Sequence, residues 1–152
     1  MKINTSRFGE IEFDDSDIIN FAEGLPGFFE LNRYALIRQE DSVFCYLQAI
    51  DDEDVAFALV DMAELVKDYD PLVDSSLIED LGKYEPEHFM VLNIAVIPEN
   101  VREMTVNLKA PIVINWNEKK GKQVICANEE YQVRHRLFSD DAEISAEKDV
   151  VE

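Results

Sequence analysis

The side chains best able to do chemistry in this chain are two cysteines, two histidines and a large number of carboxylates. Cys45 and Cys126 each lie inside an apolar run, VFCYLQAI and KQVICA. A nucleophilic cysteine needs a base and an electropositive setting, so inert core thiols are the simpler interpretation. His88 and His135 are far apart, and neither has another histidine or a cysteine at ligand spacing. These residues predict neither a catalytic centre nor a metal site.

Known catalytic and cofactor motifs are also missing from the sequence. The acidic run DDED at residues 51–54 lacks the glycine and the terminal glutamate of a calcium-binding loop, so a solvated turn accounts for it better. The chain contains no G-x-G-x-x-G, P-loop, G-x-S-x-G or H-E-x-x-H pattern. We therefore expect a protein without enzymatic activity and without a cofactor.

The charge of the chain narrows the class of partner. Thirty-three acidic residues against fourteen basic ones give a formal net charge of -19. Direct nucleic-acid binding needs a basic footprint, and anionic membranes repel such a chain, whereas basic proteins attract it.

The first residues, MKINTSRFGEIEF, do not form the apolar centre of a secretory signal, and no apolar run approaches the ~20 residues of a membrane span. We expect a cytoplasmic protein with reduced cysteines that is monomeric alone.

Short alternating or apolar runs, separated by turn residues, predict a mainly β protein. The expected strands are a hairpin within residues 1–13 and the segments 17–21, 33–39, 43–50, 55–60, 88–97, 104–108, 111–115 and 122–127. Many short strands in one domain predict a small antiparallel β-barrel-like domain over residues 1–138. Residues 139–152 contain six acidic residues, which is typical of a flexible acidic C-terminal tail.

Two short helices are expected between the strands. Asp61 followed by Glu64, and Ser76 followed by Glu79, each fit a helix N-cap with its reciprocal third position. In the second helix Leu77, Ile78, Leu81 and Tyr84 form an apolar stripe, for which core packing is the simpler role. The segment 128–138 fits either a strand or a short helix.

Five short sequence motifs occur in order along the chain: FAEGLPGF, YLQAIDDEDVAFALVD, TVNLKAPIVIN, GKQVI and YQVRHRL. Together they resemble the FliW family of flagellar assembly factors over roughly residues 1–138. Met62 stands where the family commonly has proline, and Arg136 replaces the proline of a frequent RHPL ending. Both departures lie at a turn or a strand end, so they bear on the local backbone conformation more than on the family resemblance.

The resemblance implies a small, mostly antiparallel, barrel-like β protein without enzymatic activity. Members of this family bind flagellin in the cytoplasm before export. When flagellin leaves, the freed protein binds CsrA, a basic dimeric regulator that blocks translation of flagellin messenger RNA. The antagonism is allosteric, because the CsrA surface that is bound is not the RNA-binding site.

The turn EGLPGF contains the first candidates for partner contact. Gly24, Pro26 and Gly27 are expected to fix a tight turn, since glycine permits positive φ and proline restricts φ. The side chains of Leu25 and Phe28 either pack into the core or, if they are exposed, are candidates for contact with a partner. Similarly, Gly121 is the expected turn residue within the hairpin turn NEKKG.

The segment NLKAPIVIN contains a second group of candidates. Pro111 cannot donate a ladder hydrogen bond, so a strand should end near Leu108 and an edge strand should begin at Pro111. Asn107 is expected to cap the bend and Lys109 to project outward. This motif serves the fold alone, or else the exposed edge around 105–111 receives a partner segment.

Arg134 and His135 in YQVRHRL are the last candidates, either as structural pairs for acidic neighbours or as contacts to flagellin. Two other classes of function stay open beside the partner-switching regulator. One is an acidic decoy that mimics nucleic acid and competes directly for a basic groove, with binding lost at high salt. The other is a hydrolase or metal enzyme with an unrecognised site, which no residue spacing supports.

Overall fold

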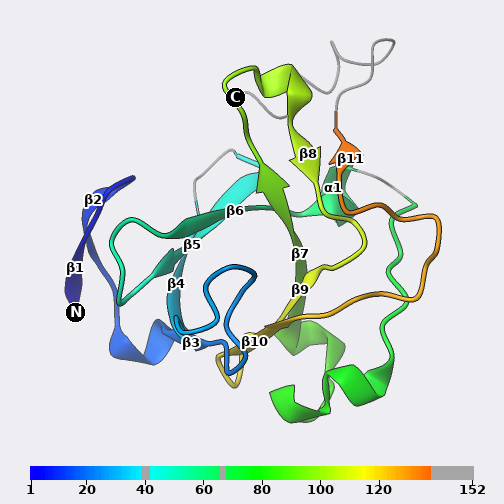
Figure 1. Ribbon diagram of the computed structural model, residues 1–152. Helices are drawn as coiled ribbons and strands as arrows, with labels where there is room; N and C mark the ends of the chain where they lie inside the picture. The colour runs from blue at the N-terminus through cyan, green and yellow to red at the C-terminus, as the bar shows by residue number, and fades with distance from the viewer. Residues whose placement is uncertain (39–41, 66–67, 138–152) are drawn as a thin grey trace.

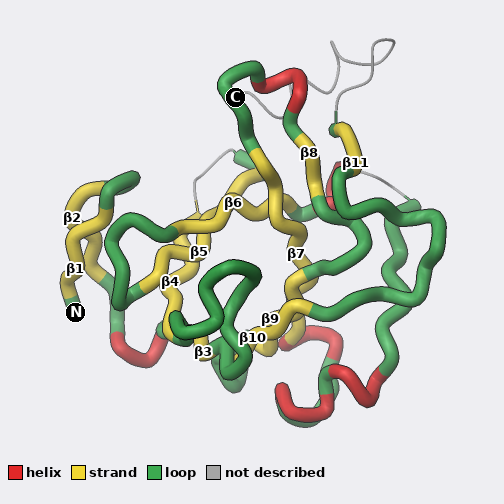
Figure 2. The backbone as a smooth tube through the Cα atoms, viewed as in Figure 1, coloured by secondary structure: helices red, strands yellow, loops and turns green. Residues whose placement is uncertain are grey.

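The structure is a computed structural model that describes residues 1–38, 42–65 and 68–137. The acidic tail predicted at 139–152 lies outside the described residues. Within them, seven strands form a closed barrel (Figures 1 and 2). These strands are β3 (Ile19–Asn20), β4 (Arg33–Arg38), β5 (Phe44–Ala49), β6 (Ala56–Val60), β7 (Phe89–Val96), β9 (Ile112–Asn115) and β10 (Lys120–Gln123). The prediction of a mainly β, barrel-like domain is confirmed.

Two pairings between distant parts of the chain close this barrel. Strand β7 pairs with β6 on one side and with β9 on the other, both antiparallel. Strand β10 pairs antiparallel with β9 and then meets β3 in a parallel pairing of Lys120 with Asn20. The parallel contact joins the two ends of the sheet, and closure removes the exposed edges that an open sheet would leave.

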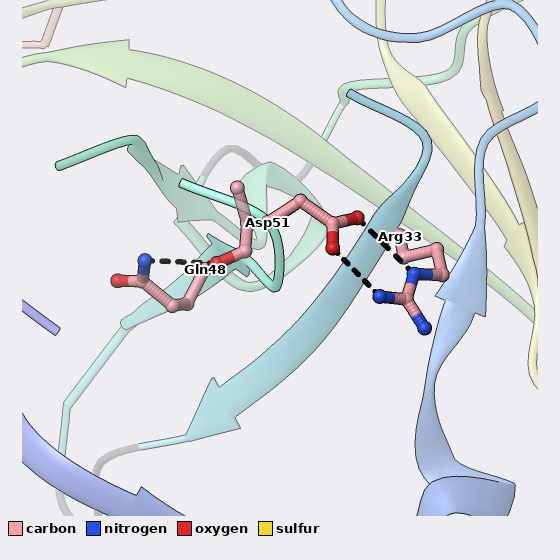
Figure 3. A network of polar contacts seen from close by, with 4 residues as sticks. Arg33, Gln48 and Asp51 are labelled. Carbon is pink, nitrogen blue, oxygen red and sulfur yellow. Dashed lines mark hydrogen bonds and ion pairs between the residues drawn. The ribbon is translucent and has the colours of Figure 1, made fainter. Parts of the chain in front are cut away.

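The strands β4, β5 and β6 are joined by short connections and pair in sequence order, as the hairpin prediction requires. The connection between β5 and β6 is held by the Gln48 side chain, whose amide donates to the carbonyls of Ala49 and Val55 at 3.1 Å each. Beside it, Arg33 and Asp51 face one another as an exposed ion pair at 2.6 Å (Figure 3). The hydrogen bonds from Arg33 hold the pKa of Asp51 below its ordinary value.

The core of the barrel is built by alternate residues of its strands, since successive side chains of a strand point to opposite faces. In β9, Ile112 and Ile114 are fully buried in the barrel cluster, with Leu47 and Leu59 from β5 and β6. Val113 points to the other face and belongs to a separate cluster on the outside. The register of β9 thereby gives the barrel an apolar interior and an apolar strip on its outer wall.

Two strand pairs extend beyond the barrel (Figure 1). The predicted N-terminal hairpin is confirmed as β1 (Lys2–Thr5) and β2 (Gly9–Glu12), which form their own two-stranded sheet. At the other end β7 continues past the barrel to pair with β8 (Thr105–Val106). Strand β11 (His135–Arg136) then pairs with β8. The segment 128–138, for which a strand and a short helix were both open, is mostly loop over its described residues 128–137, with a two-residue strand inside it.

Helical structure within the described residues is confined to single turns. These are α1 (Met62–Leu65) and the 3-10 turns η1 (Asp15–Asp17), η2 (Ser75–Leu77), η3 (Glu79–Leu81), η4 (Pro86–His88) and η5 (Val101–Glu103). The first predicted helix begins at Met62, directly after Asp61. The second prediction was wrong in both length and cap. Asp74, and not Ser76, accepts the capping bond, and the chain makes two separate 3-10 turns there.

Gly121 lies in β10, so its prediction as the hairpin turn residue was wrong. The positive φ of the turn belongs to Lys119, at 55°. Gly121 instead lets the barrel core approach the backbone, because a Cβ there would stand 2.5 Å from Cζ of Phe21. The absence of a side chain at this position is therefore a packing requirement of the barrel.

Candidate partner-binding surface

The groups best suited to chemistry do not form a catalytic arrangement in the described part of the chain. Cys45 and Cys126 are both buried and free, and burial raises the pKa of the Cys45 thiol to about 11. A thiol with such a pKa is protonated at neutral pH and therefore a weak nucleophile. His88 pairs with Glu85 at 2.8 Å on the surface, with Glu87 nearby. Partly exposed acidic groups around one histidine are ordinary surface chemistry.

The loop between β3 and β4 turns as tightly as its sequence implies. Gly24 has φ 68° and Gly27 has φ 83°, both in the region that favours glycine. At Gly24 a Cβ would stand 2.5 Å from Cα of Phe29, so the loop folds back on itself. Pro26, between the two glycines, is exposed. The two aromatic residues at the end of the turn, Phe28 and Phe29, are exposed.

Leu25 and Phe28 have different surroundings in this loop. Leu25 is fully buried in the barrel cluster, so it has no surface for a partner, and a contact role does not fit this structure. Phe28 is 36% exposed and packs edge to face against Phe57 at 5.9 Å. Phe29, which the sequence analysis did not single out, is 67% exposed. The sequence feature that could have identified Phe29 as a candidate is its position directly after a rigid turn.

The segment 107–111 is held from within the chain. Asn107 accepts a hydrogen bond from the Ala110 backbone N–H at 2.9 Å, which caps the bend as expected. Lys109 does not project freely, because its Nζ donates to the Asn128 carbonyl at 2.7 Å. Pro111 is buried and directly precedes β9. The predicted break between two strands is confirmed.

The prediction of an exposed edge at 105–111 was wrong. Strand β9 lies between β7 and β10 inside the closed barrel. Strand β8 lies between β7 and β11, and the backbone N–H groups of Leu108 and Lys109 both donate to the Gln132 carbonyl. The C-terminal part of the described chain covers this edge, and no place for a partner strand is left along it.

Arg134 and His135 lie at the outer limit of the sheet. Arg134 is exposed, and His135 is half-buried in β11, where it pairs with Val106. Neighbouring Val133 is 58% exposed. These residues and the exposed loop with Phe28 belong to different parts of the fold: β11 lies beside β8, and the loop joins β3 to β4. The sequence candidates therefore do not gather into one site.

A groove that the sequence analysis missed lies on the outer wall of the barrel. It has a volume of about 760 Å³ and runs between the segment 71–86 and the strands β7 and β9. Its apolar lining includes Val73, Ile78, Tyr84, Phe89, Val91 and Val113. The assignment of the 77–84 stripe to core packing was wrong in part: Leu81 is buried, whereas Leu77 is 38% and Tyr84 59% exposed. The sequence feature that could have indicated this groove is the β7 segment, which is apolar on both faces of the strand.

No helix of the described chain is long and apolar enough to cross a membrane. Taken together, the fold defines a small mainly β barrel with an apolar groove on its outer wall. The family model described as "FliW protein" matches residues 2–137, so the chain belongs to the FliW family.

Curated relatives and a solved structure agree with this assignment. The chain is 42% identical over 142 residues to the flagellar assembly factor FliW of Thermoanaerobacter pseudethanolicus, covering 92% of this chain and 95% of the relative. It is 39% identical over 142 residues to the protein of the same name from Ruminiclostridium cellulolyticum, covering 92% and 96%. A crystal structure of the flagellar assembly factor FliW superposes with a TM-score of 0.84 at 33% identity, covering 92% of this chain and 99% of that one.

Proposed function

We propose that this protein is a non-enzymatic, cytoplasmic flagellar assembly factor that switches between two protein partners. It binds flagellin before export. When flagellin is exported, the freed protein binds the translational regulator CsrA away from its RNA-binding site and relieves repression of flagellin synthesis. The protein acts as a monomer when alone and needs no cofactor.

The observation that carries this proposal is the family match across residues 2–137, together with relatives named flagellar assembly factors. The net charge of -19 supports a basic partner, since opposite charge speeds the encounter of two proteins. Salt screens such attraction beyond ~8 Å at physiological ionic strength. Affinity must therefore come from a desolvated apolar contact, and the exposed apolar groups around the barrel could supply one.

Calorimetric titration tests the proposal most directly. The purified protein is titrated separately with CsrA and with flagellin, at low and at high ionic strength, and then with CsrA in the presence of saturating flagellin. We expect binding to both partners, loss of CsrA binding when flagellin is bound, and affinity for CsrA that persists in part at high salt.

Other outcomes would distinguish the alternatives. The acidic net charge also fits a decoy that mimics nucleic acid. CsrA binding that vanishes at high salt and is blocked by RNA would favour the decoy, because phosphate mimicry depends on charge alone. No binding to either partner would refute the partner switch.

A further inference from the structure

A small polar pocket lies between the turn of the N-terminal hairpin and the connection from β5 to β6. It has a volume of about 310 Å³. Its six lining residues are Ser6, Arg7, Gln48, Glu53, Asp54 and Ala56. The hairpin turn docks here through Ser6, whose backbone N–H donates to the Glu53 carbonyl at 2.9 Å and whose hydroxyl donates to the Asp54 carboxylate. The pocket therefore forms only in the folded chain.

The Gln48 side chain brings a buried acceptor without a partner to this pocket. Gln48 is fully buried, and its amide nitrogen donates to the carbonyls of Ala49 and Val55 at 3.1 Å each. Two further carbonyls of the turn lie 3.3 and 3.4 Å from the same nitrogen. These four carbonyls fix the orientation of the amide, because an oxygen in that position would face only other acceptors. The oxygen Oε1 therefore points the opposite way, away from Asp51 in Figure 3, and it accepts no hydrogen bond from the described residues.

The carboxylates of the pocket favour a positively charged donor for this oxygen. A buried acceptor is stabilised by a donor that reaches it, and more strongly when the donor is charged. The Glu53 carboxylate makes no hydrogen bond or ion pair with the described part of the chain. The Asp54 carboxylate accepts from the Ser6 hydroxyl through Oδ1, which leaves its second oxygen for a ligand. Both carboxylates belong to the DDED run that the sequence pattern assigns to a solvated turn.

Arg7 limits the charge of the ligand and controls access to Gln48. Two carboxylates against one guanidinium leave the lining with one excess negative charge, which a single positive charge balances. The guanidinium stacks over the Tyr46 ring at 5.1 Å and, among the described residues, has no hydrogen bond or ion pair. Because Oε1 of Gln48 is buried, a ligand reaches it only when a lining side chain moves aside. Arg7 can rotate outward without breaking a hydrogen bond.

We propose that this pocket binds a primary ammonium group, which donates to Oε1 of Gln48 and pairs with the carboxylates of Glu53 and Asp54. A carboxylate on the same ligand would meet the Arg7 guanidinium, so a free amino acid satisfies each charged group of the lining. A lysine side chain of another protein offers the same ammonium chemistry without the carboxylate. The site does not depend on the proposed partner switch.

NMR titration of the isotope-labelled full chain tests the proposal, because it detects weak binding and the side-chain amide signal of Gln48 reports on the site directly. The chain is titrated with ethylamine, which supplies an ammonium group alone. Tetramethylammonium has the same charge but no N–H donor. Alanine and Nα-acetyl-lysine amide represent the two sources of an ammonium group, and calcium chloride represents a metal ion.

We expect ethylamine to shift the Gln48 amide signal saturably and tetramethylammonium to leave it in place, because Oε1 needs an N–H donor. Asp54→Asn keeps an acceptor for Ser6 but removes the charge, so it should weaken ethylamine binding by about tenfold or more. Glu10→Gln is the matched control, because Glu10 is exposed in β2 and does not line the pocket. It should change the affinity by less than about twofold.

Thermal unfolding of each variant checks the fold. If Asp54→Asn unfolds, Glu53→Gln replaces it, since the Glu53 carboxylate bonds to none of the described residues. Tighter binding of alanine than of Nα-acetyl-lysine amide would support the site as one for a free amino acid. The reverse order would support it as one for a lysine side chain of another protein.

Three results would overturn the assignment. A Gln48 amide signal that moves with none of the amines would refute the site. Equal shifts with ethylamine and tetramethylammonium, or equal losses in Asp54→Asn and Glu10→Gln, would reduce the effect to the net charge of -19. Saturation by calcium at lower concentration than by ethylamine would assign the pocket to a metal ion instead.

Discussion

Removing one hydroxyl, by Tyr69→Phe, tests how the segment after β8 is fastened to the barrel. The Tyr69 hydroxyl donates to the Leu108 carbonyl at 2.9 Å and accepts from Nδ2 of Asn93 at 2.8 Å. The same amide nitrogen donates to the Asn107 carbonyl at 2.9 Å. These bonds join Tyr69, which lies between α1 and η2, to the centre of β7 and to the bend at 107–110. Tyr69 and Asn93 are both buried.

The magnitude follows from the hydrogen bonds that two buried groups would lose in the phenylalanine variant. The Leu108 carbonyl would keep only the weak thiol donor Sγ of Cys126 at 3.7 Å, and Asn93 would keep its bond to Asn107 but lose the other. A buried polar group left unsatisfied costs about 1–3 kcal/mol. Because Asn93 keeps one of its two bonds, we expect a loss of about 2 kcal/mol in the free energy of unfolding. For a chain of this size that corresponds to a fall in Tm of roughly 4–8 °C.

Urea unfolding of the wild type and of two variants measures this loss. The matched control is Tyr131→Phe, which makes the same chemical change. Its hydroxyl accepts from the Asp70 N–H at 2.8 Å and donates to the Asp68 carbonyl at 3.4 Å, but these bonds are exposed. Water replaces an exposed partner, so Tyr131→Phe should cost less than about 0.5 kcal/mol. An unchanged m-value would show that the two variants unfold from similarly compact states.

Equal stabilities of Tyr69→Phe and Tyr131→Phe would refute the reasoning. That result would mean that the buried bonds of Tyr69 are no stronger, on balance, than the bonds its groups make with water in the unfolded chain. A larger loss, with a changed m-value, would instead show that the bend itself opens when the hydroxyl is absent.

Two further predictions concern buried residues. Gly121→Ala should destabilise the protein by about 1–3 kcal/mol in urea unfolding, because the added Cβ would meet the Phe21 ring; a neutral effect would show that the ring moves aside freely. Stability should also fall in alkaline solution, because burial raises the pKa of Tyr34 and Tyr69 to about 12 and of Cys45 to about 11. A raised folded pKa gives stability that is complete below the unfolded pKa and is lost as pH rises through the folded one, at up to ~1.4 kcal/mol per pH unit for each group. Urea midpoints should therefore decline above about pH 9, and a constant midpoint up to about pH 11 would contradict these shifts.

Local patterns predicted most of the strands correctly. The alternation in residues 1–13 and the short polar connections between 33 and 60 specify hairpins, because both partners lie close in sequence. Pro111 marked the break between β8 and β9, since it has no N–H for a ladder. The family resemblance rested on sequence motifs that lie in these turns and strands.

The sequence by itself therefore determined the β class, the hairpins, the strand break and the excess of acidic charge. Only the tertiary structure decided how the strands close, because the contact of Lys120 with Asn20 joins residues a hundred positions apart and leaves no local pattern. That closure buried Leu25, put β9 between two neighbours and made Gly121 a contact of Phe21. The groove has the same origin, because apolar residues that the sequence pattern assigns to the core remain at the surface where no element of the described chain packs over them.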